Sequence, residues 1–361
     1  MDAFRIEIPQ DRLDDLHTRL DLTRWPGELP GAGWGSGVPL GYLQELARYW
    51  RHDYDWRRHE RRLNEFPQFT TEIDGQRVHF LHVRSAKPGA TALVLTHGWP
   101  GSVVEFLRVL EPLSADFHLV VPSLPGYGFS GPTTEAGWDV LRIARAWSEL
   151  MRRLGYQRYA AHGGDWGALV TRELGRLDAG HVTAVHLTML PAAGLDGEDL
   201  TEDEQRRLDS RRRYQRELSG YSVLQSQRPQ TLAYALHDSP VGQLAWIVEK
   251  FHDWTDSQDA PEDAVDRDQL LTNVMVYWLT GTAGSSARLY QESAAHWRTP
   301  REPSPVPTGV SVFPKDLVPP LRRFAERTEN VVWWTEHDRG GHFPAMEQPD
   351  LLVADLREFL L

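Results

Sequence analysis

Residues 163–167 read Gly-Gly-Asp-Trp-Gly, after a short apolar run and before a segment with helical patterning. This is the form glycine-x-nucleophile-x-glycine, in which a strained turn between a strand and a helix lifts one side chain above a sheet. The flanking glycines let neighbouring backbone approach where a Cβ would collide. Taken alone, the stretch also fits a glycine-rich turn whose Asp165 caps the next helix. It predicts a strand–turn–helix unit and makes Asp165 a candidate nucleophile.

The sequence around this turn alternates short apolar runs with helical patterns, as βαβ units do. Residues 92–95 are continuously apolar, which is typical of a parallel strand buried on both faces. The same reading gives strands over residues 77–83, 92–96, 118–121, 159–161, 182–187, 309–313 and 331–335, and helices over 103–112, 138–154 and 168–177. We therefore expect an α/β fold with a mostly parallel sheet.

Two segments outside this alternation read as helical. Residues 1–71 predict an N-terminal arm with a first helix that presents Leu13, Leu16 and Leu20 on one face. A second helix is expected over 43–63, whose Trp50, Tyr54 and Trp56 dock the arm on the main domain. The second segment interrupts the alternation and predicts a lid above the carboxyl ends of the strands, where α/β sheets bind ligands. The expected organisation is an arm, a first core part, a lid and a second core part, over residues 1–71, 72–191, 192–299 and 300–361.

Composition narrows the class of protein. The 361 residues carry 39 basic and 51 acidic side chains, a formal charge of −12 that argues against nucleic acid as a partner. The absence of cysteine excludes a thiolate nucleophile and cysteine-ligated zinc, and it fits a reducing compartment. Because the sequence shows no signal peptide and no apolar span of membrane length, we expect a cytoplasmic enzyme. Whether it forms a homo-oligomer is left open.

A second constellation, His97-Gly98-Trp99-Pro100-Gly101-Ser102, directly follows the apolar strand at 92–96. A backbone N–H at the carboxyl end of such a strand can supply half of an oxyanion hole, and the residue after the nucleophile supplies the other half. We nominate the N–H groups of Trp99 and Trp166. The same loop also fits a plain strand-to-helix connection in which Ser102 caps the next helix.

The third constellation, Gly340-Gly341-His342-Phe343, lies near the C-terminus, and Asp316 follows the expected strand at 309–313. Nucleophile, acid and then histidine is the chain order of the α/β-hydrolase triad, with Asp165, Asp316 and His342 in these places. Glu336 and Asp338 are nearer to His342 in sequence and remain rival partners for it.

Taken together, these motifs resemble the microsomal-type epoxide hydrolases, including the fungal and insect juvenile-hormone members. The resemblance covers nearly the whole chain, and it rests on the Arg24-Trp25-Pro26 turn, HGWPGS at 97–102, PSLPGYGFSG at 122–131, GGDWG at 163–167, the lid segment 238–254 and RGGHF at 339–343. It implies an α/β-hydrolase core with a helical lid and an N-terminal arm. It also implies that Asp165 is the nucleophile, His342 the general base and Asp316 its acidic partner.

The resemblance further implies that two lid tyrosines, Tyr221 and Tyr290, donate to the epoxide oxygen, whereas Tyr277 fits the core. The expected reaction gives a vicinal diol through an ester of Asp165, with no metal and no organic cofactor. The expected substrate is a small apolar epoxide, because of lid aromatics such as Trp246, Trp254 and Trp278. The membrane anchor of vertebrate relatives is not expected here. A haloalkane or haloacid dehalogenase with the same Asp and His machinery is the alternative.

Overall fold

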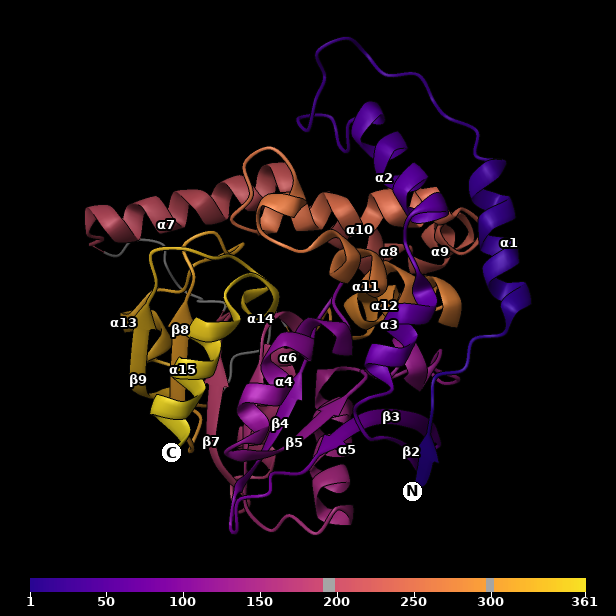
Figure 1. The fold of residues 1–361 in the computed structure, drawn as a ribbon. Coiled ribbons are helices and arrows are strands. Elements are labelled where there is room, and N and C mark those ends of the chain that lie inside the picture. Colours follow the sequence, from indigo (N-terminus) through magenta and orange to yellow (C-terminus); the bar gives the residue numbers. More distant parts are fainter. Residues whose placement is uncertain (191–198, 297–301) are drawn as a thin grey trace.

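The fold, seen in a computed structural model that describes residues 1–190, 199–296 and 302–361, is built on one sheet in the order β1-β2-β3-β5-β4-β6-β7-β8-β9 (Figure 1). The pairs from β5 through β4 and β6 to β9 are parallel, and β1, β2, β3 and β5 pair antiparallel. The strands are β1 (Asp2–Phe4), β2 (Gln68–Ile73), β3 (Gln76–Val83), β4 (Thr91–Thr96), β5 (Phe117–Pro122), β6 (Tyr159–Gly163), β7 (Val182–Leu187), β8 (Pro307–Val312) and β9 (Asn330–Glu336).

Every strand expected from the sequence is present, with ends that differ by no more than two residues. β1 and β2 were missed. They form an antiparallel edge in which polar side chains such as Gln68 and Glu72 weaken the alternating pattern, and β1 has only three residues. Because β2 spans Gln68–Ile73, the expected boundary between residues 71 and 72 falls inside a strand.

Helices cover both faces of the sheet. Leu93 and Leu95 of β4 pack on one face with α4 (Leu107–Ser114) and α15 (Pro349–Leu360). On the other face Val94 packs in the larger core with α5 (Val140–Arg153) and α6 (Asp165–Leu177). The α/β part of the chain also has four short elements: η1 (Val103–Phe106), η2 (Gly128–Ser130), α13 (Arg322–Ala325) and α14 (Pro344–Glu347). The mostly parallel α/β architecture is confirmed.

The lid lies as a helical layer over the carboxyl ends of the parallel strands (Figure 1). Its helices are α7 (Glu202–Arg213), η3 (Tyr214–Leu218), α8 (Gly220–Gln227), α9 (Pro229–Asp238), α10 (Pro240–Trp254), η4 (Pro261–Asp263), α11 (Arg267–Thr280) and α12 (Ala283–Glu292). The expected lid boundaries, at 191/192 and 299/300, lie outside the described residues. Throughout residues 1–190, 199–296 and 302–361, no helix is long and apolar enough to cross a membrane.

The N-terminal arm consists of β1, α1 (Gln10–Asp21), α2 (Leu40–His52) and α3 (Trp56–Leu63). The single helix expected over 43–63 is wrong: the chain breaks after His52, and the Asp55 side chain caps α3 by accepting from the Arg57 N–H. An aspartate in this position competes with helix continuation and favours a new helix start.

The docking partner of the arm also differs from the prediction. Its helices pack chiefly on the lid, where Trp50 Nε1 lies 3.1 Å from Met275 Sδ and the Tyr54 hydroxyl lies 2.9 Å from that of Thr272. Trp56 donates to Glu60 within α3. The arm therefore joins the sheet through β1 and the lid through α1, α2 and α3.

Candidate active site

Asp165 is the first residue of α6, directly beyond β6, and its backbone has φ +50°. This left-handed conformation is rare for a side chain other than glycine or asparagine and marks strain at a constrained position. The turn is tightly packed: a Cβ on Gly163 would collide with Gly167 O, and one on Gly167 would collide with Thr96 O. The strained turn expected from the sequence is present, and it directs the Asp165 carboxylate toward the loop after β4.

That loop, residues 97–102, supplies a donor to the carboxylate. The Trp99 N–H donates to Asp165 Oδ1 at 2.8 Å. The lid helix α11 holds the loop in place, because Tyr277 donates to Gly101 O at 2.6 Å and Asn273 donates to Pro100 O at 2.7 Å. Tyr277 thus lies in the core, as expected. The N–H of Trp166 lies in the first turn of α6, and its role as a second oxyanion donor stays a prediction.

His342 lies between two carboxylates. Its Nδ1 donates to Asp316 Oδ1 at 2.6 Å, and its Nε2 lies 3.3 Å from Asp165 Oδ2, close enough for an ion pair. The two rivals are elsewhere: Glu336 pairs with Arg207, and Asp338 is exposed beside Arg339. The Leu317 N–H also donates to Asp316 Oδ1 at 2.7 Å, which fixes that carboxylate. The structure therefore brings Asp165, Asp316 and His342 together.

The electrostatics of His342 follow from this geometry. Burial lowers the pKa of the imidazole, but the neighbouring charges of Asp316 and Asp165 outweigh burial and raise the pKa to about 10. With Asp165 in its carboxylate form, the imidazole therefore carries a proton at neutral pH. Before a protonated imidazole can act as a base toward water, the negative charges that stabilise its protonated form must be partly removed.

The lid closes the other side of the site. A cavity of about 450 Å³ contains the Asp165 carboxylate and both predicted tyrosines, Tyr221 and Tyr290. Burial raises the pKa of both phenols well above their ordinary value, so both remain proton donors at neutral pH. Apolar groups line part of the wall, and polar groups line the rest: Trp166, Met189, Ala294, Leu317 and Val318, against Arg211, Gln215, Ser219, Ser222 and Ser226.

Sequence reasoning missed four groups near the site. Tyr214 lines the cavity and shares a hydrogen bond of 2.8 Å with the Tyr221 hydroxyl. Lys250 is 2% exposed and lies 4.8 Å from the centre of the Tyr221 ring. Burial raises the pKa of Glu105 to about 8 and that of Glu347 to about 7. None of these lies in a recognisable motif, although a charged residue within an apolar lid helix, as Lys250 is, could have drawn notice.

The three lid tryptophans expected around the substrate do not line this cavity. Trp254 is fully buried, and its ring lies edge-on at 5.1 Å from the ring of His342. Trp246 donates to Gln225, and Trp278 lies against the Arg19 guanidinium. The small apolar substrate that these tryptophans suggested stays a prediction, because helix position alone does not say which face of a lid helix meets the cavity.

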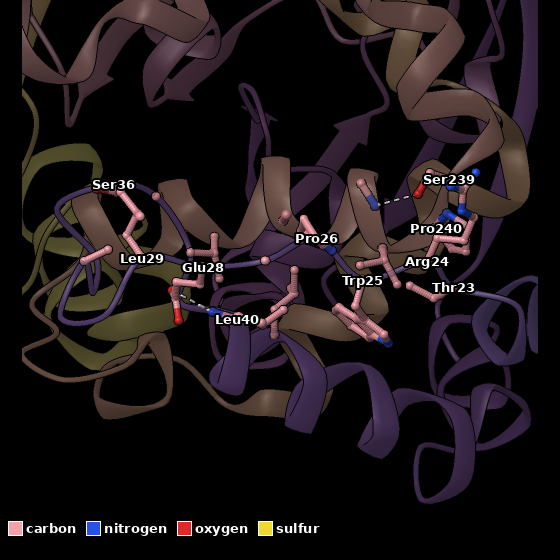
Figure 2. Close-up of a pocket in the computed structure, with 18 of the residues that line it drawn as sticks. Thr23, Arg24, Trp25, Pro26, Glu28, Leu29, Ser36, Leu40, Ser239 and Pro240 are labelled. Carbon is pink, nitrogen blue, oxygen red and sulfur yellow. Dashed lines mark hydrogen bonds between the residues drawn. The ribbon is translucent and has the colours of Figure 1, made fainter.

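A second cavity, of about 780 Å³, lies between the arm and the lid. Figure 2 shows it between the arm segment from Thr23 to Leu40 and the start of α10 at Ser239 and Pro240. It contains none of the triad residues and no buried ionisable group of the site. The smaller cavity is the candidate active site, because the strained Asp165 carboxylate and the two phenols line it and His342 Nε2 lies 3.3 Å from that carboxylate.

The described residues contain no group of three or more His, Asp or Glu side chains placed to hold a metal ion. The side chains that converge at the cavity can act as a nucleophile, a base and proton donors. Sheet order, the strained turn and the chain order of the triad together place the protein among the α/β-hydrolases.

Comparisons with known proteins give the family. The family model for the epoxide hydrolase N terminus matches residues 1–106, and the α/β-hydrolase fold model matches residues 91–218. The chain is similar to a protein of Stigmatella aurantiaca provisionally named an epoxide hydrolase, with 48% identity over 98% of this chain and 83% of the relative. It is 34% identical to epoxide hydrolase 1 of Oryctolagus cuniculus, over 99% of this chain and 88% of the relative.

Among solved structures, the Aspergillus niger epoxide hydrolase superposes with a TM-score of 0.91 at 35% identity, covering 99% of this chain and 95% of that one. The chain belongs to the epoxide hydrolase family. The resemblance noted in the sequence and the expected fold class are thereby confirmed.

Proposed function

We propose that this enzyme converts an epoxide and water to a vicinal diol through a covalent ester on Asp165. The observation that carries the proposal is one cavity that holds a carboxylate on a strained turn and two buried tyrosine hydroxyls. A carboxylate is a competent nucleophile at the strained carbon of an epoxide, and a phenol with a raised pKa can donate a proton at neutral pH.

In the first half-reaction, Asp165 Oδ2 attacks a ring carbon while Trp99 N–H holds Oδ1 at 2.8 Å. The carbon–oxygen bond of the epoxide breaks, and one of the lid phenols, Tyr221 or Tyr290, gives its proton to the departing oxygen and becomes a phenolate. The product of this step is a hydroxyalkyl ester of Asp165. Its formation removes the negative charge that lies 3.3 Å from His342 Nε2.

Once the Asp165 charge is gone, the imidazolium of His342 loses its resting proton to solvent. In the second half-reaction the neutral His342 takes a proton from water, and the resulting hydroxide attacks the ester carbonyl carbon. The N–H groups of Trp99 and Trp166 stabilise the oxyanion, an effect worth about 3–4 kcal/mol for one donor. Asp316 accepts from Nδ1 at 2.6 Å, so it holds the imidazole orientation and stabilises the cation that forms. Collapse of the intermediate expels the diol oxygen, which takes the proton from His342. The Asp165 carboxyl group then returns its proton to the tyrosine phenolate, and His342 regains a proton from solvent beside the restored carboxylate.

The cavity suggests a substrate class as well. The residues that line it include the apolar Trp166, Met189 and Leu317 as well as the polar Arg211 and Gln215. A largely apolar cavity with a few polar groups suits a small epoxide with an apolar substituent. Buried tyrosines that present O–H groups favour an epoxide oxygen over a halide leaving group, which distinguishes the proposal from a dehalogenase.

Isotope labelling tests the ester route. After a single turnover in 18O-water the diol should carry no label, and the Asp165 carboxylate should carry 18O in a peptide map. Label in the first-turnover diol would refute the proposal. The His342→Gln variant should accumulate an adduct on Asp165, visible by intact mass, and the Asp165→Asn variant serves as the unreactive control. Chloride release from simple chloroalkanes without diol formation from styrene oxide would support a dehalogenase instead.

A further inference from the structure

The surroundings of the two lid tyrosines differ. The Tyr221 hydroxyl shares a hydrogen bond of 2.8 Å with the Tyr214 hydroxyl, and the Lys250 ammonium lies 4.8 Å from the Tyr221 ring centre. The Tyr290 hydroxyl is buried and faces the Tyr221 hydroxyl, but among the described residues it makes no hydrogen bond as close as the one between Tyr214 and Tyr221. Both phenols border the Asp165 cavity, so they meet the same substrate with unequal support.

Tyr214 reaches this position through an irregular stretch of backbone. Residues Tyr214–Leu218 form a π-helical turn between α7 and α8. Such turns are rare and occur mostly where a helix must place side chains at a functional site. Tyr214 also lines the cavity, and it is seven residues before Tyr221 in the chain. The irregular turn therefore lies at the point where a phenol is brought to the hydroxyl of another phenol.

Hydrogen-bond directions then follow from the chemistry of the substrate. An epoxide oxygen accepts but cannot donate, so the Tyr221 O–H must point to it in the reactive complex. The hydrogen bond between the two phenols then requires Tyr214 to donate to the Tyr221 oxygen. A hydroxyl that accepts one hydrogen bond becomes a stronger donor in the next, because the two bonds polarise each other.

Lys250 acts on the same group through charge. Its ammonium is nearly fully buried, pairs with Glu249 and lies over the face of the Tyr221 ring. A cation near a phenol stabilises the phenolate more than the neutral ring, since attraction to a full negative charge exceeds attraction to a ring quadrupole. Tyr290 has no corresponding cation over its ring among the described residues.

We propose that Tyr214 and Lys250 are positioning residues that make Tyr221, rather than Tyr290, the group that transfers its proton to the opening epoxide. This inference rests on the proposed function. When the ring bond breaks, the epoxide oxygen takes the Tyr221 proton, and the phenolate is stabilised by the Tyr214 O–H and the Lys250 charge. Hydrolysis of the Asp165 ester releases one proton per turnover, and this proton returns to Tyr221. Tyr290 orients the epoxide oxygen without giving up its proton.

The test separates the two half-reactions. Quenched-flow mass spectrometry of the Asp165 peptide measures the rate at which the ester forms and the rate at which it disappears. Tyr214→Phe keeps the ring and removes the hydroxyl, and it should slow ester formation roughly tenfold, as expected for loss of one hydrogen bond to a group developing charge. Ester hydrolysis should be unchanged. Lys250→Met should slow the same step.

A double-mutant cycle decides between action through Tyr221 and a general disturbance of the cavity. In a Tyr221→Phe background, Tyr214→Phe should have almost no further effect, whereas in a Tyr290→Phe background it should retain its full effect. The slowing of ester formation by Tyr214→Phe should also be smaller for epoxides with electron-withdrawing substituents, because a less basic alkoxide needs less proton donation.

Tyr54→Phe is the matched control, since it removes a hydroxyl-to-hydroxyl bond of 2.9 Å at the interface of arm and lid, away from the cavity. It should leave ester formation unchanged. A full Tyr214→Phe effect in the Tyr221→Phe background, or an effect confined to ester hydrolysis, would overturn the inference. Absence of any Asp165 ester in His342→Gln would instead refute the proposed function, so the two failures are distinguishable.

Discussion

The protonation of His342 should depend on the charge of Asp165. We expect the variant Asp165→Asn to imitate the neutral ester in charge and shape, and asparagine tolerates the φ of +50° found there. At the 3.3 Å between His342 Nε2 and Asp165 Oδ2, unit charges interact by about 5 kcal/mol at an effective dielectric constant of about 20, which corresponds to about 4 pH units. Since the charges of Asp316 and Asp165 raise the pKa of His342 to about 10 in the resting enzyme, loss of the Asp165 charge should lower that pKa by several pH units.

Histidine NMR measures this shift directly. Imidazole resonances of the wild type and of Asp165→Asn are titrated with pH, and the His342 signal is assigned by its loss in His342→Gln. Kinetics give a second readout: ester hydrolysis in single turnovers should rise with pH around neutrality, as required for a neutral base. A His342 pKa in Asp165→Asn within one unit of the wild-type value would refute the reasoning, because the carboxylate would then not control the imidazole.

Three further outcomes follow from the packing. Gly98→Ala places a Cβ against the Cβ and Oδ1 of Asp165, so kcat/KM should fall about 100-fold. Gly167→Ala places a Cβ against Thr96 O, so it should chiefly lower the unfolding free energy. Kinetics and urea denaturation of both variants check this. Burial raises the pKa of Glu105 from 4.5 to about 8, so between these pH values the folded chain binds more protons at this residue than the unfolded chain. The unfolding free energy should therefore fall as pH rises through this range. Urea midpoints measured at several pH values should depend less on pH in Glu105→Gln. Trp50→Ala should lower the unfolding free energy by about 3–5 kcal/mol if arm, lid and sheet unfold together, and a separate early transition in denaturation would contradict that cooperativity.

The parts of the fold that were predictable are those with local signals. Continuous apolar runs such as β4 mark buried parallel strands, and glycines around Asp165 mark the strained turn. The triad could be nominated because its members follow strands in a known chain order. Asp316 could not be chosen over Glu336 on spacing alone, since the choice depends on which loop the sheet brings to His342.

The missed features depend on tertiary contacts. Aromatic residues in the arm predict burial but do not identify the partner that buries them. The arm was therefore expected on the main domain, whereas Trp50 contacts Met275 of the lid. β1 escaped notice because three residues carry too little pattern. Tyr214 could not be singled out because its place depends on a π-helical turn, which leaves no periodic signal in the sequence.

The arm also bears on how substrate reaches Asp165. Its first strand is an edge of the sheet, and its helices hold the lid through Trp50, Tyr54 and the pairing of Arg19 with Asp238. The arm is thus attached to the sheet at one end and to the lid at the other. A lid that opened as one rigid body would have to break these contacts together. We therefore expect substrate and product to pass the lid by local side-chain and loop motion. Substitutions of Trp50, Tyr54 or Arg19, far from the nucleophile, should change the rate of product release.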